Sequence, residues 1–415
     1  MKEKIECKGF WWLPSNPEEA VAGILTYTPG NEIILELIGM FDPKKTSIIA
    51  FLDKKPESII HGISSDSKKI TLINCNPFGS LNLNCRFPIT KYNCSLLIIG
   101  THIEDYYQKR FFKAKVVIPE LNDWCPPSVF RNEALYSNND KISSFSISFD
   151  PEGKTVNNTL IDDNTEIKLK EGVYFHSDHF SPSLEQFTYL EIIKREDSSL
   201  IDFYSNIFLF EQFLSLATLQ NSISSEITLF DKSEFQELEN DEKIFNSIQI
   251  IYPKRYYESI LNKRRQEFLF YYKSISEDFS QIIKTWYVAP IEFAPIKLLL
   301  IDSFLEKRVY SSFNFLIIIQ ALEGFCTRFR KEDCLFNMIQ MIIDEFSNID
   351  KLLGDNINIK QVVDSRHYYS HYMKKSKKPN TLDGIELYYL MDIPLHSIPL
   401  FRCIVYHHSS PYWTT

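Results

Sequence analysis

The spacing of apolar residues changes once along the chain, near Asp278, and this change constrains the fold more than any other feature. Before it, apolar and β-branched residues form short runs separated by Gly, Pro, Asn and Asp, and several runs alternate with polar residues. Such runs are typical of strands in sheets with one face in water. The predicted strands are residues 33–38, 46–52, 69–73, 96–100, 111–118, 145–149, 223–230 and 248–252, with one helix at 205–219. The pattern favours a β-sandwich or a similar layered β-structure.

After Asp278 the apolar residues recur at i, i+3, i+4 and i+7, which is the spacing of amphipathic helices. Five segments carry it, at residues 278–288, 293–310, 311–329, 334–349 and 359–373, with Pro290, Ser311, Lys331 and Gly354 between them. These segments predict an all-α bundle. The fold class is therefore α+β, with a β-rich, sandwich-like domain at residues 1–265 and a helical bundle at 270–415.

Charge and hydropathy limit the partners of the chain. The net charge is −9, whereas a protein that binds nucleic acid over its whole surface is usually basic, so any RNA contact must be local. The N-terminus lacks an apolar core of signal-peptide length, and the most apolar run, 313–322, is too short and polar to cross a bilayer. Eight scattered cysteines without C-x-x-C spacing suit free thiols in a reducing compartment. We therefore expect a cytoplasmic protein without membrane contact or cofactor.

One helical segment, residues 364–372, concentrates side chains able to carry chemistry. His367 and His371 are four residues apart and share a helix face. Arg366 precedes His371 by five residues, about 140° around the axis. Its long side chain could still swing toward His371 or reach a second copy of the motif across a dimer, and the offset makes the arrangement within one helix the more awkward of the two. Lysines follow at 374, 375, 377 and 378.

These residue types fit cleavage of an RNA phosphodiester without metal. A histidine exchanges protons near neutral pH, and an arginine can bind the phosphate and stabilise the charge of the transition state. We predict Arg366, His371 and His367 as catalytic residues. The predicted RNA-binding residues, which would stack on bases or contact phosphates, are Tyr368, Tyr369, Tyr372, Lys374 and Lys375. The same residue types also suit a polar bundle surface or an aromatic interface, and the lysine run suits a solvated helix end.

Weaker candidates lie elsewhere. His176 and His179 could bind a metal but lack an obvious third ligand, so no metal site is predicted. Trp11 and Trp12 could stack on a ligand but more often belong to a core or interface. Glu323 suits helix packing or a dimer contact, with a supporting hydrogen bond to Arg366 conceivable. Cys326 and Cys334 suit the core.

The motif and its surroundings resemble a known family. Arg366-His-Tyr-Tyr-Ser-His371 matches the R-polar-x-x-x-H motif of the HEPN superfamily on a late helix of a bundle, and residues 320–324 (QALEG) resemble a helix of ApeA-type HEPN proteins. Further similarity to the ApeA N-terminal domain lies in residues 9–14 (GFWWLP), 23–25, 34–39, 98–102 and 121–124. The resemblance covers nearly the whole chain, although Pro394 and Pro399 interrupt what the family continues as a final helix.

The resemblance implies an abortive-infection protein that defends against phage. In such proteins a β-rich domain senses or regulates, here in response to a phage-derived trigger, and a HEPN homodimer cleaves RNA, often tRNA. Arg366 and His371 then match the catalytic pair, and His367 takes the polar position, where the family more usually has Asn. The alternative is a non-catalytic sensor that dimerises through its bundle and binds RNA or nucleotide.

Overall fold

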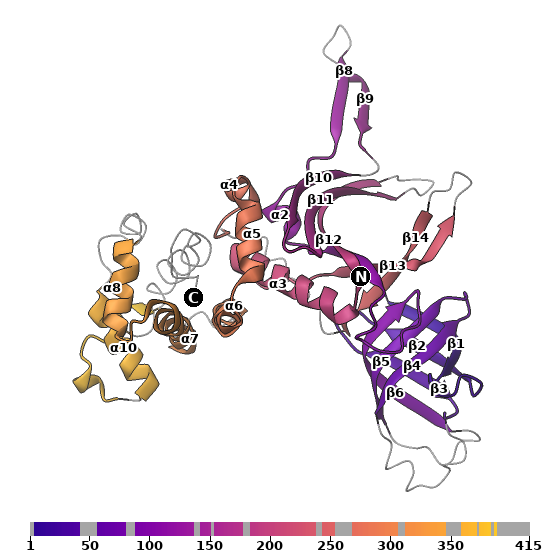
Figure 1. Ribbon diagram of the computed structural model, residues 1–415, viewed down its shortest axis with the longest axis horizontal. Coiled ribbons are helices and arrows are strands. Elements are labelled where there is room, and N and C mark those ends of the chain that lie inside the picture. The colour runs from indigo at the N-terminus through magenta and orange to yellow at the C-terminus, as the bar shows by residue number, and fades with distance from the viewer. Residues whose placement is uncertain are drawn as a thin grey trace. The chain divides into compact units, whose positions relative to one another are not determined.

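The computed structural model describes residues 4–41, 56–79, 88–136, 142–150, 153–176, 183–237, 243–253, 268–305, 312–345, 358–371, 373–382 and 386–387. The chain forms two compact units (Figure 1). The N-terminal unit comprises Met1–Ile207 and Ile223–Gln266, and the C-terminal unit comprises Phe208–Ser222 and Glu267–Thr415. The predicted strand at 46–52 and the segment around Pro394 and Pro399 lie outside the described residues.

Six strands of the N-terminal unit close into an antiparallel barrel. They are β1 (Ile5–Trp12), β2 (Val21–Tyr27), β3 (Ile33–Ile38), β4 (Glu57–Ser64), β5 (Lys69–Phe78) and β6 (Ile89–Ile99). Their order is β6-β3-β2-β1-β4-β5, and β5 pairs again with β6. Alternate residues point inward, and the interior is filled by Trp11, Leu25, Leu35 and Leu72, all fully buried. A Cβ at Gly62 would clash with the Trp11 ring, so the barrel requires glycine beside this large side chain.

The remaining strands extend the same sheet from β6 in the order β14, β13, β7, β12, β11, β10. They are β7 (Phe111–Val117), β10 (Lys154–Leu160), β11 (Thr165–His176), β12 (Ser183–Ser198), β13 (Glu226–Glu237) and β14 (Lys243–Ile251). β8 (Arg131–Tyr136) and β9 (Ile142–Ser148) form a separate hairpin, and α2 (Leu121–Trp124) is a single turn. The region is β-rich as predicted, but one 12-stranded sheet that includes the barrel, with the β8–β9 hairpin apart from it, replaces the sandwich-like arrangement. Closure leaves β5 and β6 no free edge, which two separate sheets would leave exposed.

Helices form at each segment where helical spacing predicts one. They are α3 (Leu200–Thr218), α4 (Tyr272–Ile275), α5 (Phe279–Val288), α6 (Ala294–Leu305), α7 (Ser312–Phe325), α8 (Leu335–Glu345) and α10 (Ile359–His371), with a π-helical turn at Cys326–Arg330 and 3-10 turns at Ile291–Phe293 and Lys375–Lys377. Within the described residues, no helix is long and apolar enough to cross a membrane.

Helix α7 packs against several other helices of the C-terminal unit. It packs against α6, α8 and α10, and α10 also packs against α8. Phe315, Ile319, Leu322 and Phe325 of α7 are buried, which fits its apolar sequence on most sides. Glu323 follows Leu322 on this helix, and its carboxylate contacts Arg366 of the motif on α10. That all these helices form a HEPN bundle stays a prediction.

Candidate active site

Helix α10 carries the motif between a capped beginning and a lysine-rich end. The side-chain oxygen of Asn358 accepts a hydrogen bond from the backbone N–H of Lys360 at 3.1 Å, which satisfies a free amide at the helix N-terminus. Ile359, Val362 and Ser365 are buried, while His371 at the last helical position is exposed. The helix therefore places the end of the motif in solvent, where a substrate can reach it.

The Arg366 side chain is held by a carboxylate and lies against a histidine. Its Nε is 3.1 Å from Oε1 of Glu323 on α7, and its Nη2 donates to Oε2 of Glu323 at 3.1 Å. Paired contacts of this kind fix the plane of a guanidinium. Its Nη1 lies 3.3 Å from Nε2 of His371. Of the two arrangements left open by the sequence, the structure therefore has the one within a single helix, because the long arginine side chain spans the angular offset.

His367 lies in a second set of contacts, beside a lysine that follows the helix. Nζ of Lys378 is 3.2 Å from Nδ1 of His367 and donates to Oδ1 of Asp364 at 3.1 Å. The amide nitrogen of Asn380 donates to the other oxygen of Asp364 at 2.9 Å. The rings of His367 and His371 have their centres 6.2 Å apart. The helix thus presents two imidazoles together, each beside a cationic side chain.

This arrangement shifts the protonation of two groups. Burial lowers the pKa of His367, and the charges of Lys378, Arg366 and His371 lower it further, against the weaker opposite effect of Asp364. Burial alone would raise the pKa of Asp364, but the hydrogen bonds from Asn380 and Lys378 outweigh it, so the pKa is lowered. At neutral pH, His367 is therefore uncharged and Asp364 is ionised.

The segment after the helix folds back onto it. The Leu382 backbone N–H donates to Oγ of Ser365 at 2.9 Å, and the Tyr369 hydroxyl donates to the Leu382 carbonyl oxygen at 3.0 Å. Oγ1 of Thr381 donates to the carbonyl oxygen of Lys378 at 2.8 Å. We call residues 378–382 the return segment. It fixes Lys378 and Asn380 beside the motif.

The predicted RNA-binding residues lie in different surroundings. Lys374 and Lys375 are exposed, and Tyr368 is half-buried with its ring 5.0 Å from that of Tyr369. Tyr369 also packs edge-on against Phe315 of α7, with 6.3 Å between ring centres. Tyr372 lies outside the described residues. Base stacking by these tyrosines stays a prediction, and the contacts of Tyr369 already stabilise the packing of α10.

The sequence did not predict that Lys378, Asp364 and Asn380 contact one another or His367 at the site. Lys378 looks like one lysine in a solvated run, and Asp364 and Asn380 carry no motif. The pair Lys378–Pro379 offers a signal, because a proline after the run marks a turn that can reverse the chain. The conceivable hydrogen bond between Glu323 and Arg366 is present.

The weaker candidates have other surroundings. His176 is exposed at the end of β11 and His179 lies outside the described residues, among which no group of three or more His, Cys, Asp or Glu could hold a metal ion. Trp11 lies in the barrel core, while the Trp12 ring is 5.4 Å from that of His102. Cys326 is buried as expected, but Cys334 is exposed because it precedes α8 rather than lying within it.

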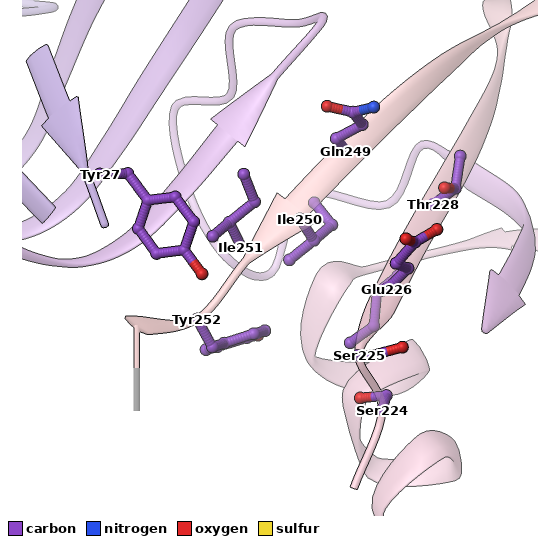
Figure 2. A pocket seen from close by; sticks show the side chains of 10 residues that line it. Tyr27, Ser224, Ser225, Glu226, Thr228, Gln249, Ile250, Ile251 and Tyr252 are labelled. Atoms are coloured by element: carbon purple, nitrogen blue, oxygen red, sulfur yellow. The ribbon is translucent and has the colours of Figure 1, made fainter. Parts of the chain in front are cut away.

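The N-terminal unit contains a small cavity of about 110 Å³. Figure 2 shows Glu226 and Thr228 of β13 and Gln249 of β14 along neighbouring strands, with Tyr27 of β2 on the barrel side. Typical sites for organic ligands measure roughly 300–1,000 Å³. This cavity is therefore too small to hold a ligand of ordinary size without rearrangement.

Comparison with protein families finds two matches. Residues 6–286 match the model described as ApeA N-terminal domain 1, and residues 335–406 match Apea-like HEPN. The second match contains Arg366, His367, His371 and Lys378, whereas Glu323 lies outside it. No curated protein and no solved structure matches the chain. Since the first model covers well over half of the 415 residues, the chain belongs to the ApeA family, with an ApeA N-terminal domain followed by an Apea-like HEPN domain.

Proposed function

We propose that this protein is a metal-independent endoribonuclease of phage defence by abortive infection, with Arg366 and His371 as its catalytic residues. Membership of the ApeA-like HEPN family suggests an RNase-type defence role. The observation that carries the finer proposal is the placement of Arg366. Glu323 holds its guanidinium through Nε and Nη2. The remaining nitrogen, Nη1, lies 3.3 Å from Nε2 of His371 at the exposed end of α10.

In the proposed reaction the ribose 2′-hydroxyl attacks the adjacent phosphorus. Nε2 of His371 accepts the hydroxyl proton, the 2′-oxygen–phosphorus bond forms and the bond from phosphorus to the 5′-oxygen breaks. A proton is returned to the leaving 5′-oxygen, so the products are a 2′,3′-cyclic phosphate and a 5′-hydroxyl, with no net consumption of water. Arg366 neutralises the charge that builds on the phosphate oxygens, a role worth several kcal/mol in a preorganised site.

The rest of the proposal concerns assembly and control. The HEPN part, residues 270–415, would dimerise and bind RNA, with tRNA as a candidate substrate and with Lys374 and Lys375 as phosphate contacts. Residues 1–265 would sense a phage-derived trigger in the cytoplasm. Two exposed lysines beside the site give local positive charge on a chain whose net charge is −9, which is what a local RNA contact requires.

The test combines phage challenge with RNA cleavage by purified protein. Wild-type protein should protect cells and cleave RNA in the presence of chelator, leaving cyclic phosphate ends. Arg366→Ala and His371→Ala should lose both activities while keeping their helical content, and Glu292→Gln, an exposed change on the same unit, should lose neither. Full cleavage by either alanine variant, or cleavage that stops in EDTA and returns with magnesium, contradicts the proposal.

A non-catalytic RNA-binding sensor is the second candidate. One observation favours this candidate. The ion pair with Glu323 already balances the charge of Arg366, so less of that charge is left to stabilise a transition state. Tight RNA binding by the wild-type chain without cleavage, under conditions where infected cells die, would establish this candidate instead.

A further inference from the structure

The two histidines of the motif are held through different ring nitrogens. Nζ of Lys378 lies 3.2 Å from Nδ1 of His367. An ammonium group donates but cannot accept, so Nδ1 accepts and the proton of neutral His367 is on Nε2. Within the described part of the chain, Nε2 of His367 has no hydrogen-bond partner. His367 thus carries its N–H on Nε2, the ring nitrogen that Lys378 does not contact.

His371 has the opposite arrangement. Nη1 of Arg366 lies 3.3 Å from its Nε2, and a guanidinium also only donates, so Nε2 of His371 carries the lone pair. His371 is exposed at the helix end. A phosphate that draws Arg366 toward itself would free this lone pair to accept a proton. The two histidines therefore differ in role: His367 is a hydrogen-bond donor through Nε2, and His371 is a base through Nε2.

Lys378 is held in place by other contacts, so its ammonium stays beside Nδ1 of His367. Its ammonium donates to Asp364, which is 7% exposed and also accepts from Asn380 at 2.9 Å. The return segment that carries it is tied to α10 at a further point, where the Leu382 N–H donates to buried Ser365 at 2.9 Å. A cation held against one side of an imidazole disfavours protonation of that ring.

We infer that Lys378 is a positioning residue that fixes His367 as a neutral N–H donor to the RNA phosphate and leaves proton exchange to His371. The inference rests on the proposed ribonuclease function for the identity of the ligand. The state of His367 itself does not depend on that function. Lys378 is thereby distinct from the exposed lysines of the same run, for which the proposed role is contact with RNA phosphates.

The first experiment titrates His367 by NMR in the full chain with labelled histidine, with the signal assigned by its loss in His367→Gln. In Lys378→Met the pKa of His367 should rise toward the ordinary value of about 6.5, because Asp364 remains while a cation is lost. Lys377→Met removes the same charge from the exposed neighbouring position and should leave the pKa unchanged. Lys378→Arg keeps the positive charge and the hydrogen-bond donor, so the pKa of His367 should stay as low as in wild type.

No rise in Lys378→Met, or an equal rise in Lys377→Met, overturns the role of Lys378. Arg366 and His371 also face His367 and are unchanged in all three variants, so their effect cancels. Thermal melting of each variant establishes that the compared chains are folded. This readout needs no catalysis, so its failure is distinguishable from failure of the proposed function.

The second experiment separates the tasks of the two histidines. A glutamine side-chain amide can place an N–H near the position of imidazole Nε2 but cannot exchange a proton. His367→Gln should therefore keep cleavage within about tenfold of wild type, while His371→Gln should lose about a hundredfold or more. Equal loss in both variants overturns the assigned division. A wild-type chain that cleaves no RNA overturns the proposed function and the phosphate role of His367, whereas the titration still decides the role of Lys378.

Discussion

At the scale of residues, the site depends on one ion pair between helices. Arg366 and Glu323 are each about one-quarter exposed at the side chain, with values of 26% for both. Solvent screens such a pair, so its contribution to stability is small. Its value lies in orientation, because two contacts at 3.1 Å direct the remaining guanidinium nitrogen to His371.

The change Glu323→Gln tests this orienting role. The amide keeps one acceptor but loses the charge and the second acceptor, so Arg366 should sample other positions. We expect the initial rate of RNA cleavage to fall about tenfold to a hundredfold, with the melting temperature nearly unchanged. Glu292→Gln removes the same charge from an exposed position and should leave the rate as it is. A rate for Glu323→Gln equal to wild type would show that Arg366 needs no carboxylate.

The lowered pKa of His367 predicts a dependence of stability on pH. Its folded pKa lies below the unfolded value, so the unfolded chain binds the proton more readily. The stabilisation is complete above the unfolded value of about 6.5 and is lost as the pH falls toward the folded pKa. Between pH 7.5 and 5.5 the melting temperature of wild type should therefore fall more than that of His367→Gln. If the melting temperatures of the two proteins fell equally over this pH range, the lowered pKa of His367 would be contradicted.

At the scale of elements, the return segment makes the end of α10 part of a site. Ser365 is fully buried, and its hydroxyl accepts the Leu382 N–H. The Tyr369 hydroxyl donates to the carbonyl of the same residue. Together these bonds hold the residues that contact His367 and Asp364, so local opening here would also release Lys378.

The change Ser365→Ala tests this connection. It leaves the Leu382 N–H without an acceptor, which costs about 1–3 kcal/mol, and should speed hydrogen exchange of that amide accordingly. The matched control is Ser370→Ala, because the Ser370 hydroxyl donates to the Arg366 carbonyl one turn earlier in the same helix. That carbonyl can keep its helical partner, so Leu382 exchange should remain at the wild-type rate. Unchanged exchange in Ser365→Ala would mean that the return segment is held elsewhere.

At the scale of the whole molecule, the contact between Arg366 and His371 bears on the number of copies that build one site. Each chain brings Arg366 and His371 within 3.3 Å, so a single chain already holds both groups. A two-fold pair would add a second histidine for the leaving group and would gather the exposed lysines of both chains. A dimer therefore serves proton return and RNA binding rather than the meeting of Arg366 with His371.

Light scattering should accordingly give a dimer at micromolar concentration, as the proposed function requires. Mixing Arg366→Ala chains with His371→Ala chains should not restore cleavage, because neither chain of a mixed dimer keeps the Arg366–His371 pair that forms within one chain. The melting curve of each variant serves as control. Cleavage by a strictly monomeric wild-type chain would remove the dimer from the mechanism.

The sequence by itself predicted part of the local structure and the position of the candidate site, although strands such as β4, β11 and β12 were not predicted. Apolar spacing is read within a few residues, so it predicted the strands around Leu35 and Leu72 and the helices that carry Glu323 and Arg366. Spacing does not encode which distant strands meet, so only tertiary structure decided that β5 pairs with β6 to close a barrel. The same holds for the site. Contacts of Arg366 with Glu323, 43 residues apart, and of Lys378 with His367, 11 residues apart, depend on helix packing and chain reversal. A local pattern can mark the turn, but it does not specify which side chains the turn and the packing bring together.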